Sequence, residues 1–217
     1  MEPLTVDGIA PPLVVAGATL ALLAWRRFGG LGRRPAIDAA MICVLVLLAA
    51  VLELDMGRPV KYRNGPLRLW SGDIYSDQNS QQIADPYTFT HFTHGAAFYG
   101  LTWLAMRPAS VATRLIVATG AEAAWEAYEN TDAVVERYRS QTISLGYYGD
   151  SLVNSVADIA ACMVGFLLAW RLPRAATVTW VASFELALAY LIRDSLALNI
   201  LMLVYPIDAV RAWQAGL

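Results

Sequence analysis

Two histidines stand out because they fall inside an otherwise apolar stretch of the chain. His91 and His94 are the only histidines, and a spacing of three residues places both imidazoles on roughly one face of a helix. A histidine pair one turn apart is a common half of a metal site. The alternative is a pair that hydrogen-bonds to loop backbone or to lipid headgroups.

Carboxylates recur at helical spacing further along the chain. Glu122, Glu126 and Glu129 are four and three residues apart, so they share one stripe of a helix. Like charges this close in a low dielectric need a proton, a cation or an arginine between them. We therefore expect Glu122 and Glu126 to have a chemical role, and we expect Glu129 and Asn130 to be solvated in the headgroup layer.

A third polar series follows at a spacing of four residues, with Asp150, Asn154 and Asp158 on one predicted face. Asp150 alone also suits the N-cap of a helix, where a carboxylate accepts backbone N–H groups. Asp158 lies two turns deeper and cannot be a cap. An ionisable residue inside a bilayer is costly, so its presence indicates a function.

Together these groups predict a site for a divalent metal ion, either zinc, manganese or iron, because imidazole and carboxylate oxygens suit these ions. Such an ion could activate water for hydrolysis. The predicted metal ligands are His91, His94, Glu126 and Asp150. The predicted catalytic groups are Glu122, Glu126 and Asp158. The chain contains no Gly-x-Ser-x-Gly or Ser–His–Asp pattern, which argues against a covalent serine mechanism.

Other polar and aromatic residues suggest how a substrate would be held. Arg193 is a candidate counter-charge for the carboxylates or an anchor for a phosphate. Trp70 and Tyr148 either contact substrate or anchor the protein at the membrane interface. The predicted substrate-binding residues are Arg193, Asn154, Tyr148 and Trp70. The polar row 79–82 reads as an ordinary loop.

Composition indicates the elements that must position these groups. Of 217 residues, 57% are hydrophobic and 16% are charged, and the mean hydropathy is +0.45, whereas soluble domains average about 45–50% apolar and about 25% charged residues. The sequence therefore predicts an all-α, multi-pass transmembrane bundle that forms one domain, 1–217. The expected spans are 8–25, 36–54, 89–106, 113–130, 151–170 and 175–192, with a seventh stretch, 196–210, that either crosses the membrane or lies at its interface. A net charge of -2 without a basic tail gives no indication of nucleic-acid binding.

The arginines predict how the chain is oriented in the membrane. The turns after the first, third and fifth spans contain arginines and no acid, namely Arg26, Arg27, Arg33, Arg34, Arg107, Arg114, Arg171 and Arg174. Such turns are typically cytoplasmic, which places the N-terminus and the long loops outside, in the periplasm of a bacterial inner membrane. The N-terminal residues lack the basic start of a signal peptide. Cys43 and Cys162 lie in apolar runs and predict packing, not a disulfide or a zinc cluster.

Several rows of the chain resemble the uncharacterised bacterial membrane protein family named domain of unknown function 2585. The matching rows include HFTHGAAFY (91–99), EAAWEAYEN (122–130), RYRSQTISLGYYGDSLVNSVAD (137–158) and IRD (192–194). The resemblance covers about three quarters of the chain and implies no activity. The chain also resembles, more distantly, VanZ-like membrane proteins, through His91, Glu126, Asp150, Asn154 and Asp158.

Three functions are compatible with this pattern. The first is a membrane hydrolase that acts on a lipid or a lipid-linked substrate. The second is a non-enzymatic accessory subunit of a membrane complex, with a protein partner in the membrane and the polar cluster acting as an inter-helix network. The third is a small proton-coupled transporter, for which Glu185 is the only carboxylate near the middle of a span.

Overall fold

The computed structural model describes residues 6–29, 34–144 and 146–216, and all regular secondary structure in these residues is helical. Arg33, one of the arginines used to predict the orientation, lies outside the described residues. In chain order the helices are α1 (Val6–Phe28), α2 (Pro35–Asp55), α3 (Thr88–Ala105), α4 (Val111–Glu129), α5 (Asp132–Gln141), α6 (Leu152–Arg171), α7 (Arg174–Leu191), α8 (Leu196–Val204) and α9 (Asp208–Ala215). Each of the six expected main spans thus coincides with a helix.

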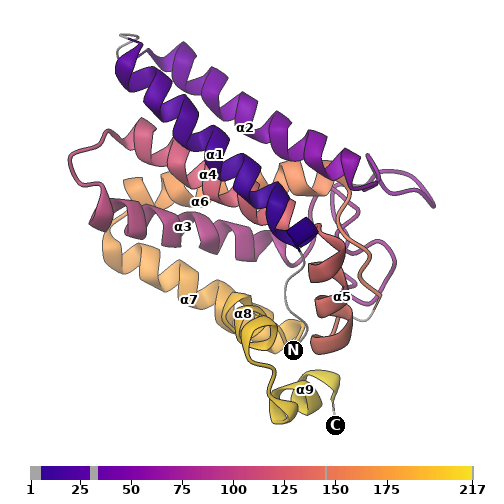
Figure 1. Ribbon diagram of the computed structural model, residues 1–217. Coiled ribbons are helices and arrows are strands. Elements are labelled where there is room, and N and C mark those ends of the chain that lie inside the picture. Colours follow the sequence, from indigo (N-terminus) through magenta and orange to yellow (C-terminus); the bar gives the residue numbers. More distant parts are fainter. Residues whose placement is uncertain (1–5, 30–33, 145, 217) are drawn as a thin grey trace.

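The six long helices form a bundle in which α3, α4 and α6 occupy the middle (Figure 1). Helices α1 and α2 cover α4 on one side, and α7 lies along α3 on the other (Figure 1). Apolar side chains from four of these helices form the main core, among them Val15, Leu45, Ile116 and Ile159. The bundle therefore places α3, α4 and α6, which carry the polar series, next to one another.

Glycines allow α3 and α6 to cross at very short range. A Cβ at Gly95 of α3 would overlap the carbonyl oxygen of Cys162 and lie 2.5 Å from the amide nitrogen of Phe166. A Cβ at Gly165 of α6 would likewise overlap the carbonyl oxygen of Phe92. Small residues at helix crossings let backbones approach closely in membrane proteins. This approach brings Asp158 of α6 toward the histidines of α3.

Three described helices, α1, α2 and α6, are long and apolar enough to cross a membrane. A fourth span results if α7 and α8, which meet at a 70° bend, count as one broken span. The expected six or seven spans are therefore not supported. Helices α3 and α4 have the length, with 18 and 19 residues, but their polar side chains reduce their hydropathy. Large apolar side chains such as Leu20, Leu47, Leu101 and Leu186 are exposed on the bundle, as membrane helices require.

The expected seventh stretch, 196–210, is not one helix. Helix α8 has nine residues, and nine residues are too few to span a bilayer at 1.5 Å per residue. A break that contains Pro206 separates α8 from α9. The carboxylate of Glu185 accepts the backbone N–H groups of Leu196 and Ala197 and so caps α8.

All the long connections lie at one end of the bundle, together with α5 and α8 (Figure 1). The sequence predicted only a polar loop where α5 forms. Arg58, in the loop after α2, donates hydrogen bonds to the carbonyl oxygens of Asn130 and Tyr148 and to the carboxylate of Asp132. This three-way contact joins the loop after α2, the α4–α5 junction and the loop before α6 into one cover over the end of the bundle.

Candidate functional site

One carboxylate joins the two histidines beneath this cover. His91 Nδ1 lies 2.6 Å from Glu122 Oε1, and His94 Nδ1 lies 3.1 and 3.0 Å from the two oxygens of the same carboxylate. The imidazole rings are 5.0 Å apart, and Glu122 is fully buried. A carboxylate only accepts, so both imidazoles donate from Nδ1, and each Nε2 keeps its lone pair in the neutral form. The spacing of three residues therefore produces the shared face that the sequence predicted.

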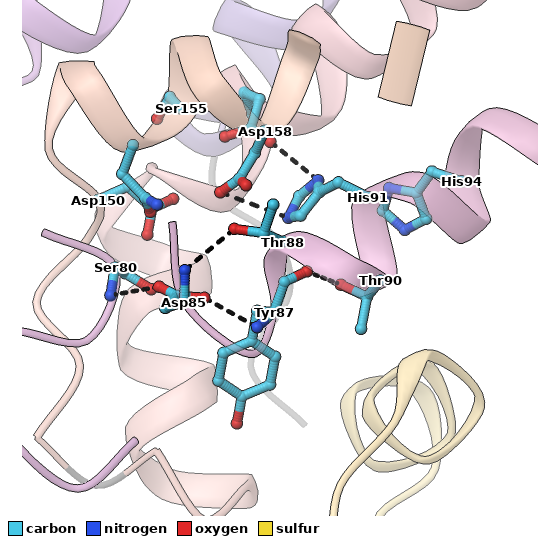
Figure 2. A network of polar contacts seen from close by, with 12 residues as sticks. Ser80, Asp85, Tyr87, Thr88, Thr90, His91, His94, Asp150, Ser155 and Asp158 are labelled. Atoms are coloured by element: carbon cyan, nitrogen blue, oxygen red, sulfur yellow. Dashed lines mark hydrogen bonds and ion pairs between the residues drawn. The ribbon is translucent and has the colours of Figure 1, made fainter. Parts of the chain in front are cut away.

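Two further carboxylates surround His91. Glu126 Oε1 lies 3.3 Å from His91 Nδ1, and Asp158 Oδ2 lies 3.9 Å from His91 Nε2. Figure 2 shows His91 between Asp158 and His94. Glu126 Oε1 and Asp158 Oδ1 are buried and accept no hydrogen bond from any described residue. Buried acceptors without a donor are unusual and call for a missing partner such as water or an ion.

The described residues contain two groups whose donor atoms lie within 4.8 Å of one another and could hold a metal ion. The first group is His91, His94 and Glu122, and the second is His91, Glu126 and Glu129. Imidazole and carboxylate together suit zinc, manganese and iron. Compared with the prediction, Glu122 joins the candidate ligands, whereas Asp150 belongs to neither group. The expectation that Glu129 and Asn130 are solvated is also wrong, because Glu129 is half-buried and Asn130 is fully buried.

A cavity of about 40 Å³ adjoins the cluster and has His91, His94, Glu129, Asp150 and Asp158 in its wall. A water molecule needs about 10–15 Å³ of such volume, so the cavity has room for a few waters or for an ion with part of its water shell. A second pocket of about 260 Å³ lies outside it and extends to Tyr75, which is 69% exposed. The two share Asn79, Ser144 and Tyr147 in their walls. These three residues therefore separate the cluster from the surface at the loop end.

Asp150 forms its own buried network at the start of α6. Its two carboxylate oxygens accept hydrogen bonds from the Tyr147 hydroxyl and the Asn130 amide, each at 3.0 Å. Burial, and next the nearby Glu129 carboxylate, raise the pKa of Asp150 to about 7. Burial also raises the pKa of Tyr147 well above its usual value, with Asp150 as the next cause. The N-cap of α6 is Ser151, whose hydroxyl accepts a hydrogen bond from the backbone N–H of Asn154. The interpretation of Asp150 as the cap is therefore wrong.

The four predicted substrate-binding residues are dispersed. Arg193 is exposed and donates to the carbonyl oxygen of Trp213 in α9. Tyr148 lines the outer pocket and donates its hydroxyl to the Asp77 carbonyl oxygen. Trp70 packs edge-to-face on Phe89 and lines neither pocket. Asn154 is buried, and its side-chain amide nitrogen has no partner among the described residues. Only Tyr148 therefore lies on a route toward the cluster.

Loop residues that the sequence left aside support the site. Gln81 is fully buried and donates to the carbonyl oxygens of Ser80 and Gly149, which refutes the reading of row 79–82 as an ordinary loop. Asp85 accepts the backbone N–H groups of Ser80 and Tyr87 (Figure 2). Burial raises the pKa of Asp85, and these N–H groups counteract the rise. Asp85 lies three residues before Thr88, where α3 begins, and aspartates just before a helix often accept backbone N–H groups. The sequence could have predicted this role from that position.

The chain belongs to the family described as protein of unknown function DUF2585, whose family model matches residues 53–216. Its relatives include a UPF0314 protein of Paracoccus denitrificans, 51% identical over 80% of this chain and 90% of that protein. Another, from Sinorhizobium fredii, is 53% identical over 81% of this chain and 89% of that protein. A third, from Sphingopyxis alaskensis, is 44% identical over 87% of this chain and 98% of that protein. No solved structure matches the chain, and the more distant resemblance to VanZ-like proteins stays a prediction.

Proposed function

We propose that this DUF2585 protein is a bacterial inner-membrane enzyme that uses a divalent metal ion, zinc, manganese or iron, to hydrolyse a lipid or a lipid-linked substrate. The observation that carries the proposal is the buried group of His91, His94 and Glu122, whose donor atoms lie within 4.8 Å of one another. Imidazole and carboxylate groups from two adjacent helices already converge here, and a metal ion would replace the protons that they share. Their place beside a water-sized cavity supports a catalytic ion.

The side chains around the ligands support hydrolysis. A divalent ion bound here would lower the pKa of a water molecule toward neutrality and so supply a nucleophile. Glu126 Oε1 and Asp158 Oδ1 have no donor among the described residues, which leaves either of them free to take a proton from that water. Glu126 lies 3.3 Å and Asp158 lies 3.9 Å from His91, so both carboxylates adjoin the proposed ligands.

The arrangement of pockets and charges supports access from the loop end. The outer pocket of about 260 Å³ meets the inner cavity at Asn79, Ser144 and Tyr147. The opposite end of the bundle has the arginine-rich turns, which are typically cytoplasmic. The site would then face the periplasm, and the polar part of a lipid or lipid-linked substrate would enter the outer pocket while its apolar part stays in the membrane.

A non-enzymatic accessory role is the alternative that one observation favours. The inner cavity, at about 40 Å³, is too small for a lipid headgroup unless the cover moves, and a closed His–carboxylate network could serve only to hold α3, α4 and α6 together. Such a subunit would need a protein partner in the membrane. The transporter alternative has less support, because the Glu185 carboxylate is engaged with the N-terminus of α8.

Metal content tests the proposal directly. The full-length protein is purified in detergent without added metal, and bound elements are measured by mass spectrometry for the wild type, His94→Ala, Glu122→Gln and Glu53→Gln. Glu53 is the matched control, because it is also a fully buried glutamate but belongs to neither donor group. We expect near one equivalent of zinc, manganese or iron in the wild type and in Glu53→Gln, and loss of that metal in the other two variants.

Hydrolysis of lipid substrates follows as the second measurement. The metal-containing protein is assayed with phospholipid and lipid-linked phosphate substrates, beside Asp158→Asn and Glu126→Gln. If one of these variants keeps its metal but no longer hydrolyses the substrate, the replaced carboxylate is the proton acceptor. A folded wild type without metal, or with metal that persists in Glu122→Gln, would refute the metal-hydrolase proposal and favour the accessory role.

A further inference from the structure

A groove of about 560 Å³ runs along the second half of α3, away from the covered end of the bundle. Trp103 in its wall is twelve residues after His91 on the same helix, which is roughly 18 Å at 1.5 Å per residue. Small residues form part of its wall, with Ala96 and Gly100 from α3 and Ala169 from α6. Thr177 and Val178 of α7 form part of the opposite wall. The groove therefore lies between the second half of α3 and the first half of α7.

The groove lies beside the half of α7 that packs less closely on α3. Phe184 of α7 packs on Phe89 at 4.9 Å and on Phe92 at 6.3 Å between ring centroids, both near the start of α3. Leu188, in the same half of α7, is the one buried residue of that helix. Toward the start of α7, the contact with α3 is that of the Arg174 guanidinium with the Trp103 ring, which leaves the groove beside it open. In a membrane such a gap has to be filled by apolar groups from outside the described residues.

The mouth of the groove is positively charged. The guanidinium groups of Arg107 and Arg174 lie over the Trp103 ring, 4.3 and 4.9 Å from its centroid. Both arginines are exposed, and neither forms an ion pair within the described part of the chain. The groove lining includes no Asp or Glu. Arginine heads beside a tryptophan are groups that contact phosphate at the level of lipid headgroups.

We propose that this groove binds a phospholipid with an anionic headgroup. One acyl chain lies along the small residues of α3 and α6, and the headgroup phosphate lies between Arg107 and Arg174. The volume falls within the usual range for ligand pockets, and basic pockets between membrane helices are typical sites for anionic lipid headgroups. A basic residue near the membrane surface favours an anionic lipid by about 5-fold, so the two arginines should give a preference of about 30-fold over a zwitterionic lipid.

Native mass spectrometry of the full-length protein in detergent tests this binding. Phosphatidylglycerol and phosphatidylcholine with identical acyl chains are added in equal amounts, and the bound lipids are counted. We expect the wild type to retain one phosphatidylglycerol in preference to phosphatidylcholine. Arg107→Gln with Arg174→Gln should reduce that preference to near one while some lipid remains bound.

A second variant fills the groove without disturbing the bundle. A Cβ at Gly100 meets nothing within 4 Å, so Gly100→Leu should fold and should lose both lipids. Gly17→Leu in α1, where a Cβ also has open space, is the matched control and should bind lipid as the wild type does. Equal binding of the two lipids to the wild type, or unchanged phosphatidylglycerol binding to Gly100→Leu, would overturn the proposal. So would a change from dimer to monomer in Gly100→Leu, because it would show that a second copy of the chain fills the groove.

Discussion

The close crossing of α3 and α6 makes Gly95→Ala the most direct test of how the fold supports the site. The alanine Cβ would overlap the Cys162 carbonyl oxygen and approach the Phe166 amide nitrogen to 2.5 Å. Both are backbone atoms, so no rotamer change relieves the overlap, and the helices must separate. Overpacking a tight interior costs about 1–3 kcal/mol, and a backbone collision belongs at the upper end of that range. Alanine has a higher helix propensity than glycine, which stabilises the folded state by about 1 kcal/mol and offsets part of this cost.

The net loss of about 2 kcal/mol corresponds to a melting temperature lower by roughly 4–8 °C for a chain of this size. Separation of the helices also lengthens the 3.9 Å distance between His91 Nε2 and Asp158 Oδ2, so the proposed lipid hydrolysis should fall as well. The assay is thermal unfolding followed by circular dichroism in one detergent, with metal content and lipid hydrolysis measured on the same samples.

Gly100→Ala is the control because it makes the same change on the same helix. Its Cβ meets nothing within 4 Å, so only the gain in helix propensity remains, worth about 1 kcal/mol or roughly 2–4 °C. If Gly95→Ala melts at the same temperature as Gly100→Ala, or above it, the collision does not occur and the described crossing is wrong.

Two further predictions concern the end of the bundle that carries the long connections. The pKa of Asp150 is raised from 3.8 to about 7, so between these pH values the folded metal-free protein keeps a proton that the unfolded chain has released. The contribution of Asp150 to the free energy of unfolding is therefore largest below pH 3.8 and is lost as the pH rises to about 7. Asp150→Asn should flatten this decline in thermal scans from pH 4.5 to 8, and a wild type with a constant melting temperature over that range would contradict the assignment. Glu185→Gln should weaken the cap of α8 by about 1 kcal/mol, seen as faster hydrogen exchange at the amides of Leu196 and Ala197, with metal content unchanged. Exchange at the wild-type rate would mean that the carboxylate is not needed as a cap.

Helix positions could be predicted from the sequence because each long apolar run ends at arginine, proline or a polar loop. The number of membrane crossings could not, because α3 and α4 are helices of sufficient length whose polar side chains face their neighbours in the bundle. Helix α5 was also missed. It has ten mostly polar residues, and what holds it is tertiary packing, including Tyr138 against Tyr147.

Spacing predicted which site residues share a face of each helix. Separations of three and four predicted which side chains share a face of one helix, and the packing of α3, α4 and α6 then brings His91, His94, Glu122, Glu126 and Asp158 together. Spacing could not place residues in loops or at turns. Arg193 has a positive φ of 54°, which is part of a turn that directs its side chain toward α9 and away from the carboxylates.

The three bonds of Arg58 also determine when the cover over the site can form during folding. They join positions 72, 74 and 90 residues apart in the chain. Contacts at such separation form late, because the entropy of closing a long loop opposes them until other interactions have brought the ends together. The bundle of α1 to α4 therefore assembles before the loop that precedes α6 can be tied down. During synthesis and insertion the histidine pair and Glu122 would meet while still open to water, so an ion could reach them before the cover closes.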